Sequence, residues 1–223
     1  MSFGCTGGGD NVGAVKLLLG GSPCTYWSMA QTKNRETIAS GKGWELFHNY
    51  VIVIDKFQPD YFLYENNKSM AKAIREQITA VLGVEPTLIN SALVSAQNRE
   101  RLYWCGRRTS KGTYDRVHIP QPEDRGIMLS AVLASEHSDL RPVSKWVYRP
   151  FFNDDKRRKI DVLKTIDSKK TYTLTTRPCH YQNYICTADR TMYFNLSPEE
   201  YEALQTLPKG YTAMLPRSHR YST

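Results

Sequence analysis

Three short polar segments of this sequence carry the side chains best suited to chemistry, and each adjoins an apolar run. They are Pro23-Cys24, Glu65-Asn66 and the segment from Gln97 to Arg101. A cysteine after a strand is either a small buried filler or a nucleophile. Each segment alone also has an ordinary explanation as packing, a cap or surface charge. The order and spacing of the three together therefore carry the functional signal.

The elements expected around these segments alternate between strands and helices up to about residue 106. Apolar runs predict strands at 15–19, 61–64, 86–90 and 101–105, and helical spacing predicts helices at 44–57 and 69–82. This alternation is typical of an α/β fold with a mostly parallel sheet. Ligands bind at the carboxyl ends of the strands in such sheets, where Cys24 and Glu65 are expected.

The pattern changes after Gly106. Residues 107–170 combine mixed charge and several prolines without a sustained apolar period. A β-branched strand is predicted at Thr171–Thr176. Ser197-Pro198-Glu199-Glu200 has the residues of a capping box, which predicts the start of a last helix.

The composition suits a soluble globular protein of 223 residues, with 40% hydrophobic residues. The sequence contains neither an apolar run long enough to span a bilayer nor a secretory signal, so we expect a cytoplasmic protein and no membrane partner. The five cysteines have no metal-ligand spacing, so neither zinc nor disulfides are expected. A net charge of +8 and a pI near 9.2 favour a polyanionic partner such as nucleic acid.

With these motifs in order, the sequence resembles the cytosine-C5 DNA methyltransferase family over about residues 15–220. The matching motifs are Gly20-Gly21-Ser22-Pro23-Cys24, Glu65-Asn66 and Gln97 to Arg101, followed by Thr173 to Arg177 and Leu196 to Pro208. The resemblance implies part of a doubly wound, Rossmann-like methyltransferase sheet with an irregular α+β target-recognition region. A bacterial or phage source fits such an enzyme.

The resemblance also implies the roles of the catalytic residues. Cys24 is the expected nucleophile for carbon 6 of cytosine, with its thiolate favoured by nearby arginines. Glu65 would hydrogen-bond or protonate ring nitrogen 3, and burial would have to favour its protonated form. Arg101 would hold the carbonyl oxygen of the base, and Arg99 would brace the loop that carries Cys24. The base must leave the duplex to reach them, so base flipping is implied.

Further assignments follow from the same resemblance. Ser22, Asn66 and Gln97 are expected to bind the substrate, which is double-stranded DNA with the target cytosine flipped out. Pro23 is expected to contact the methyl donor, S-adenosyl-L-methionine. No metal is expected.

The resemblance divides the chain into a partial catalytic domain at 1–106, a target-recognition region at 107–170 and a return to the catalytic domain at 171–223. Basic side chains in the middle region would contact phosphates, among them Arg107, Arg108 and the cluster Lys156 to Lys159. The ordinary alternative for that cluster is a solvated surface.

The ends of the sequence depart from the family pattern. Family members carry an aromatic-x-Gly-x-Gly turn and further strands that bind the methyl donor before the Pro-Cys motif, yet only 23 residues precede Cys24 here. Phe3 to Gly9 imitates that turn only superficially, and the family's final Gly-Asn motif is not found. Three hypotheses stay open: a fragment of a longer gene, a split subunit that a complementary N-terminal subunit completes, or a non-catalytic DNA-binding relative. An RNA target is a further alternative. In each case an exposed apolar edge and face of the sheet are expected.

Overall fold

The computed structural model describes residues 14–29, 33–143, 163–175 and 183–221. The chain forms two compact units: the first comprises residues 1–89 and 101–120, and the second comprises 90–100 and 121–223. The segment 107–170, expected to recognise the target, therefore contributes to both units. Its recognition role stays a prediction.

A mixed sheet forms the centre of the first unit. Its strands are β1 (Leu17–Gly20), β2 (Tyr61–Asn67), β3 (Thr87–Asn90), β4 (Glu100–Arg108) and β5 (Tyr114–Arg116). They lie in the order β1-β2-β4-β3, with β5 paired to β4. β1 and β2 are parallel, whereas β4 runs antiparallel to both β2 and β5. The expectation of a mostly parallel sheet is thus wrong for β4, which follows β3 after nine residues and has no crossover helix.

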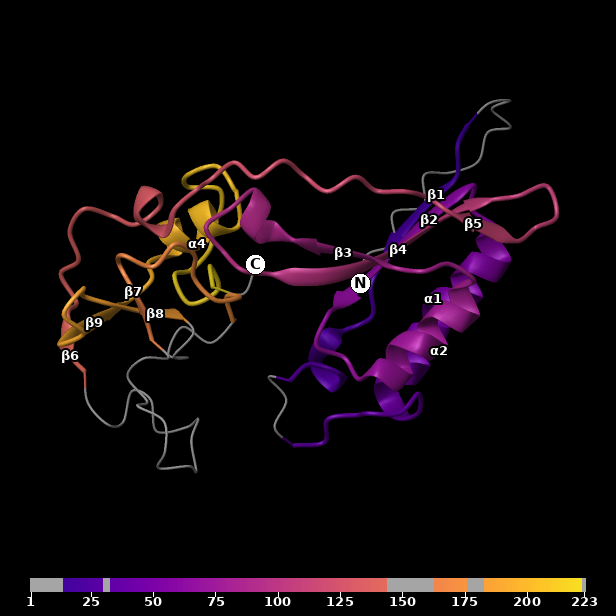
Figure 1. The fold of residues 1–223 in the computed structure, drawn as a ribbon, viewed down its shortest axis with the longest axis horizontal. Helices are drawn as coiled ribbons and strands as arrows, with labels where there is room; N and C mark the ends of the chain where they lie inside the picture. Colours follow the sequence, from indigo (N-terminus) through magenta and orange to yellow (C-terminus); the bar gives the residue numbers. More distant parts are fainter. Residues whose placement is uncertain (1–13, 30–32, 144–162, 176–182, 222–223) are drawn as a thin grey trace. The chain divides into compact units, whose positions relative to one another are not determined.

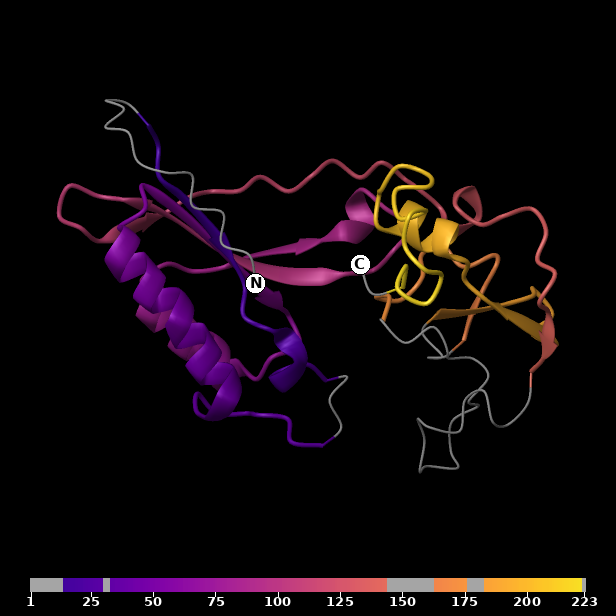
Figure 2. The ribbon, with the colours of Figure 1, turned by 180° about the vertical axis from the view of Figure 1, so that it is seen from behind.

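Two helices cover one face of this sheet (Figures 1 and 2). They are α1 (Gly41–Phe57) and α2 (Lys72–Leu82), close to the predicted ranges. Phe47 and Ile74 from these helices pack with Phe62, Tyr64 and Trp104 from the sheet in one buried cluster. α1 ends before Gln58 and α2 before Gly83, both in the left-handed conformation that terminates helices.

The other side of β1 is open to solvent. Leu17 and Leu19 keep 56% and 61% of their surface exposed, and the preceding Val15 keeps 67%, whereas Leu18 points into the helix-covered core. β1 is also the terminal strand of the sheet formed by the described residues. The apolar edge and face expected from the sequence are therefore present in this structure.

The second unit contains a smaller sheet and a short helix. The sheet has the order β6-β9-β8-β7, formed by β6 (Arg141–Pro142), β7 (Lys164–Thr165), β8 (Tyr184–Cys186) and β9 (Met192–Asn195). Short 3-10 helices lie at Ser91–Leu93 and Leu129–Ala131. The helix α4 (Pro198–Leu204) begins with the predicted capping box, since Ser197 and Glu200 exchange both expected hydrogen bonds.

The predicted strand at Thr171–Thr176 is wrong over its described part. Only Thr171 forms a β-bridge, with Gln97, and residues 172–175 are irregular. The reason is that side chains satisfy this backbone: Gln97 accepts from the N–H of Leu174, and Asn183 accepts from that of Thr175.

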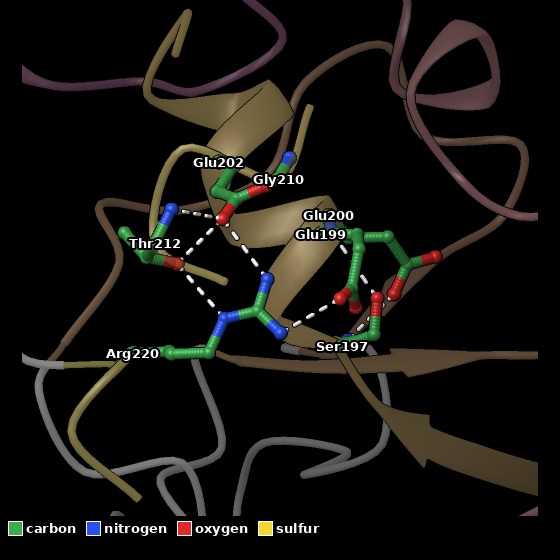
Figure 3. A network of polar contacts seen from close by, with 7 residues as sticks. All are labelled: Ser197, Glu199, Glu200, Glu202, Gly210, Thr212 and Arg220. Atoms are coloured by element: carbon green, nitrogen blue, oxygen red, sulfur yellow. Dashed lines mark hydrogen bonds and ion pairs between the residues drawn. The ribbon is translucent and has the colours of Figure 1, made fainter. Parts of the chain in front are cut away.

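A buried carboxylate fastens the chain after α4. Glu202 is 2% exposed and accepts hydrogen bonds from the Gly210 and Thr212 backbones and from Arg220 (Figure 3). Arg220 also reaches Glu199 at 2.8 Å. None of the helices in the described ranges is both long and apolar enough to cross a bilayer.

Candidate active site

Cys24 begins a short 3-10 helix, Cys24–Tyr26, four residues after β1 ends. Its side chain is exposed, and its carbonyl accepts hydrogen bonds from the N–H groups of Trp27 and Ser28 at 3.1 and 2.9 Å. Pro23 precedes it and is also exposed. The turn therefore presents the thiol to solvent.

The other described cysteines are poor nucleophiles. Cys105 and Cys186 are buried, and desolvation raises the pKa of both thiols, that of Cys186 to about 11. A thiol that is buried and protonated at neutral pH neither reaches a substrate nor attacks it. Among the described cysteines, Cys24 is therefore the candidate nucleophile.

The Pro-Cys turn is joined directly to the end of β2. Gly20 lies opposite Tyr64 in the parallel pairing of β1 and β2, so the two strands end at the same edge. The Asn66 amide donates to the Ser22 carbonyl at 3.1 Å, and the hydroxyls of Ser22 and Tyr64 lie 2.6 Å apart. These contacts bring the first two motifs together.

Ser22 and Asn66 use these contacts within the protein. Both side chains are buried, at 9% and 1% exposed, and burial raises the pKa of the adjoining Tyr64 hydroxyl. Their assignment to substrate binding stays a prediction. Their contacts indicate that Ser22 and Asn66 position the Pro-Cys turn against the end of β2.

Gly21 lies against Glu65 so closely that a side chain would not fit. A Cβ built on Gly21 would lie 2.6 Å from the Glu65 backbone oxygen and 3.3 Å from its carboxylate Oε2. A glycine is therefore required where the turn passes the carboxylate. In the sequence, Gly21 stands out only as part of the motif Gly20 to Cys24.

Glu65 and Arg101 form an ion pair on the sheet face opposite the helices. Arg101 lies opposite Asn67 in the antiparallel pairing of β2 and β4, so Glu65 is its diagonal neighbour on the same face. The Arg101 Nε lies 2.9 Å from the Glu65 Oε1. The Glu65 side chain keeps 36% of its surface exposed, so it is only partly buried here, and the guanidinium compensates its charge.

Gln97 and Arg99 belong to the second compact unit. Gln97 is 1% exposed, and its amide accepts from the Leu174 N–H and donates to the Leu204 carbonyl at 3.2 Å. The Arg99 N–H donates to the Asn90 side chain at 3.0 Å, and its own side chain is half-buried. Gln97 thus ties its loop to Leu174 and to the last residue of α4, and its substrate role stays a prediction.

Lys170 supports the same loop and was missed by sequence reasoning. Its ammonium donates to the carbonyls of Ala92, Ser95 and Ile127 at 2.6 to 2.9 Å. A single lysine among other charged residues offers no signal for such a role. The contact becomes visible only when the three segments are folded together.

The basic residues of the middle region lie in different places. Arg107 is exposed on β4, and Arg108 donates to Gln58 at 2.7 Å, both within the first unit. The cluster Lys156 to Lys159 lies outside the described residues. The predicted phosphate contacts of these side chains stay predictions.

Comparison with known proteins identifies the family to which these motifs belong. The family C-5 cytosine-specific DNA methylase matches residues 9–139, more than half of the chain. The chain therefore belongs to this family. Its architecture is α/β, with a Rossmann-like methyltransferase sheet and a second, irregular α+β unit.

Known relatives are much longer than the region they share with this chain. The chain is 33% identical over 102 residues to the orphan methyltransferase M.SPRI of Bacillus phage SPR, covering 41% of this chain and 23% of that protein. It is 33% identical over 101 residues to the type II methyltransferase M.FnuDI of Fusobacterium nucleatum, covering 41% and 28%. The match thus spans about a quarter of each relative.

A solved structure shares the fold. A mutant of the Spodoptera frugiperda DNMT2 protein superimposes with a TM-score of 0.57 and 16% identity, covering 93% of this chain and 73% of that one. At this level of identity the likeness concerns the fold alone.

Proposed function

We propose that this chain contributes the base-handling half of a DNA (cytosine-5-)-methyltransferase. It would act on a cytosine flipped out of double-stranded DNA through a covalent adduct with Cys24. One observation carries this proposal: the exposed Cys24 begins a turn that packs against Glu65, and Glu65 is paired with Arg101. A nucleophile, a carboxyl group and a guanidinium are thereby supplied from neighbouring strand ends.

The reaction assigned to these residues balances as follows. The Cys24 thiolate bonds to carbon 6 of cytosine, and the π-electron pair of the 5,6 double bond moves through the ring toward nitrogen 3. Glu65, after its carboxyl group has taken up a proton from solvent, would donate a hydrogen bond or that proton to nitrogen 3, and Arg101 would bind the carbonyl oxygen at carbon 2. The electron-rich adduct is then nucleophilic at carbon 5. After methylation, a base to which no described residue is assigned takes the carbon 5 proton, and nitrogen 3 returns its proton to Glu65. The 5,6 double bond is thereby restored and the thiolate is expelled.

S-adenosyl-L-methionine, when bound, would supply the electrophilic methyl group for carbon 5 and would leave as a neutral thioether. Pro23 is exposed next to Cys24 and fits a contact with this donor. We assign no other described residue to it. The apolar edge formed by Val15, Leu17 and Leu19 supports a further proposal, that a complementary N-terminal segment carrying the donor site covers β1.

Two modified bases test the proposal in separate steps. Pyrimidin-2-one lacks the amino group of cytosine and so accepts a thiolate at carbon 6 without a methyl donor. DNA containing this base should give a complex with the wild-type chain that survives denaturing electrophoresis, and Cys24→Ser should give none. Cys186→Ser is the control for loss of an unrelated thiol and should form the complex.

5-Fluorocytosine tests methyl transfer, because the methylated adduct has no carbon 5 proton to lose. This complex should require S-adenosyl-L-methionine and, under the proposal, the complementary segment. Wild-type protein that binds DNA but never forms either complex would overturn the catalytic function and leave a non-catalytic DNA-binding relative. A preference for matched RNA in competition would replace DNA as the substrate.

A further inference from the structure

The turn that carries Cys24 has little internal support of its own. Cys24–Tyr26 is a single 3-10 turn, and Pro23, Cys24 and Thr25 are all exposed. The hydrogen-bond geometry of a 3-10 turn is poorer than that of an α-helix, so the turn contributes little stability by itself. The position of the thiol therefore depends on the residues on either side: Ser22, which is bonded to the end of β2, and Tyr26 and Trp27.

Arg35 and Glu36 hold Tyr26 and Trp27. The Glu36 N–H donates to the Tyr26 carbonyl at 2.9 Å, and the Arg35 Nε donates to the Trp27 carbonyl at 3.2 Å. The Trp27 indole is fully buried and donates its Nε1–H to the Glu36 Oε2 at 3.0 Å. Arg35 and Glu36 thus hold the backbone of Tyr26 and Trp27 and also the Trp27 side chain.

The Glu36 carboxylate also caps α1. It accepts from the Gly43 N–H at 3.1 and 3.2 Å, in the first turn of the helix, where the Ser40 side chain makes no capping hydrogen bond. A negative charge at this end is favoured by the helix dipole. The contact is close, since a Cβ on Gly43 would lie 2.5 Å from the Trp27 Nε1 and 2.7 Å from the Glu36 Oε2.

Arg35 connects the same turn to the segment after β2. Its Nη2 donates to the Ser69 carbonyl at 2.6 Å, two residues beyond the strand that carries Glu65. The Ser69 hydroxyl donates to the Asn67 side-chain oxygen at 2.6 Å and accepts from the Met29 N–H at 3.2 Å. Two sets of hydrogen bonds therefore connect the residues after the turn to the end of β2, one through Arg35 and one through Met29.

We propose that Arg35 and Glu36 are positioning residues, which fix the Cys24 turn between the start of α1 and the end of β2. They act through Tyr26, Trp27 and Ser69 and touch no reacting atom. This inference rests on the proposed function, because the position of Cys24 matters only if its thiol attacks a base. A displacement of about 1 Å in such a group can slow a reaction on the order of 100-fold.

Glu36→Gln is the sharpest variant, because it keeps the size of the side chain. It replaces one acceptor oxygen by an amide NH2, which would face the N–H of Trp27 or of Gly43. Arg35→Lys keeps the charge but cannot donate to Trp27 and Ser69 together. Glu45→Gln is the matched control, since Glu45 is an exposed residue of α1 that forms an ion pair with the exposed Lys42.

The experiment measures two quantities for each variant. Amide hydrogen exchange reports the turn itself, and we expect faster exchange at Trp27, Ser28 and Gly43 with unchanged protection in β2 and β4. The rate of covalent complex formation with pyrimidin-2-one DNA should fall about 10- to 100-fold, while the dissociation constant for DNA stays within about twofold. Glu45→Gln should match the wild type in both.

The outcomes separate this inference from the proposed function. A wild-type protein that forms no adduct overturns the proposed function, and the inference with it. If Glu36→Gln and Arg35→Lys form the adduct at the wild-type rate, the inference is overturned and the proposed function stands. Unchanged amide exchange at Trp27 and Gly43 in these variants would also overturn the inference. A loss of protection throughout β2 and β4 would overturn it too, because it would show a general role in stability.

Discussion

The carboxylate of Glu65 and the guanidinium of Arg101 lie 2.9 Å apart on neighbouring antiparallel strands, beside the turn that carries Cys24. The antiparallel pairing of β2 with β4 places the two residues diagonally on one face, so the sheet sets the geometry of the pair. Under the proposed function, these two groups and the thiol of the adjoining turn would act on the same base.

Glu65→Gln should separate chemistry from folding. Losing the carboxyl group should slow adduct formation with pyrimidin-2-one DNA by about 100-fold or more, in the range of general acid catalysis. The unfolding free energy should change by less than about 1 kcal/mol, because the ion pair is partly exposed. Single-turnover kinetics and urea unfolding measure the two. Adduct formation within about threefold of the wild type would remove Glu65 from the reaction.

Gly21→Ala should displace the Pro-Cys turn. The added methyl would lie 2.6 Å from the Glu65 backbone oxygen, which cannot move away without disturbing β2. We expect a loss of about 1–3 kcal/mol in stability and loss of the adduct. Gly83→Ala is the control: its backbone also disfavours alanine at φ +70°, yet nothing lies within 4 Å of the added methyl. It should lose about 1–2 kcal/mol and still form the adduct, and equal adduct formation by both variants would contradict the prediction.

The open edge of β1 can be tested with lysine substitutions. Leu17→Lys and Leu19→Lys should change the unfolding free energy by less than about 0.5 kcal/mol and reduce self-association in sedimentation experiments. Leu18→Ala, on the buried face, should cost about 2–5 kcal/mol. If the two lysine variants were destabilised as much as Leu18→Ala, β1 would be covered in solution.

Glu202 should make stability depend on pH in acid. Hydrogen bonds from Thr212, Arg220 and Gly210 lower the pKa of its carboxyl group to about 2, from an ordinary value of 4.5. The stabilisation is complete above pH 4.5 and is lost as the pH falls toward 2. The difference in urea midpoint between wild type and Glu202→Gln should therefore be constant near neutral pH and shrink below pH 4.5. A difference that stays constant from pH 7 to pH 3 would contradict this.

Local patterns predicted the local structure well. The capping box at Ser197 and the helices α1 and α2 depend on residues within a few positions of each other, and all three are confirmed. The antiparallel direction of β4 was missed, because strand order depends on partners far apart in the chain. The segment after Thr171 has strand-like residues, yet its backbone bonds to the side chains of Gln97 and Asn183 instead.

The sequence predicted the reactive groups of the candidate site but not the residues that support them. Cys24, Glu65 and Arg101 belong to motifs with recognisable spacing, and the structure brings Cys24's turn, Glu65 and Arg101 together. Arg35 and Glu36 lie in a polar stretch without a motif. Their contacts reach residues from seven to 34 positions away, so no local pattern reveals them.

Mass spectrometry of the digested pyrimidin-2-one complex tests most directly whether Cys24 bonds to the base. We predict the added mass of the nucleoside on the peptide that contains Cys24, with the peptides of Cys105 and Cys186 unmodified. Nucleoside mass on a different residue, or a covalent complex that persists in Cys24→Ser, would contradict the assignment of Cys24 as the nucleophile.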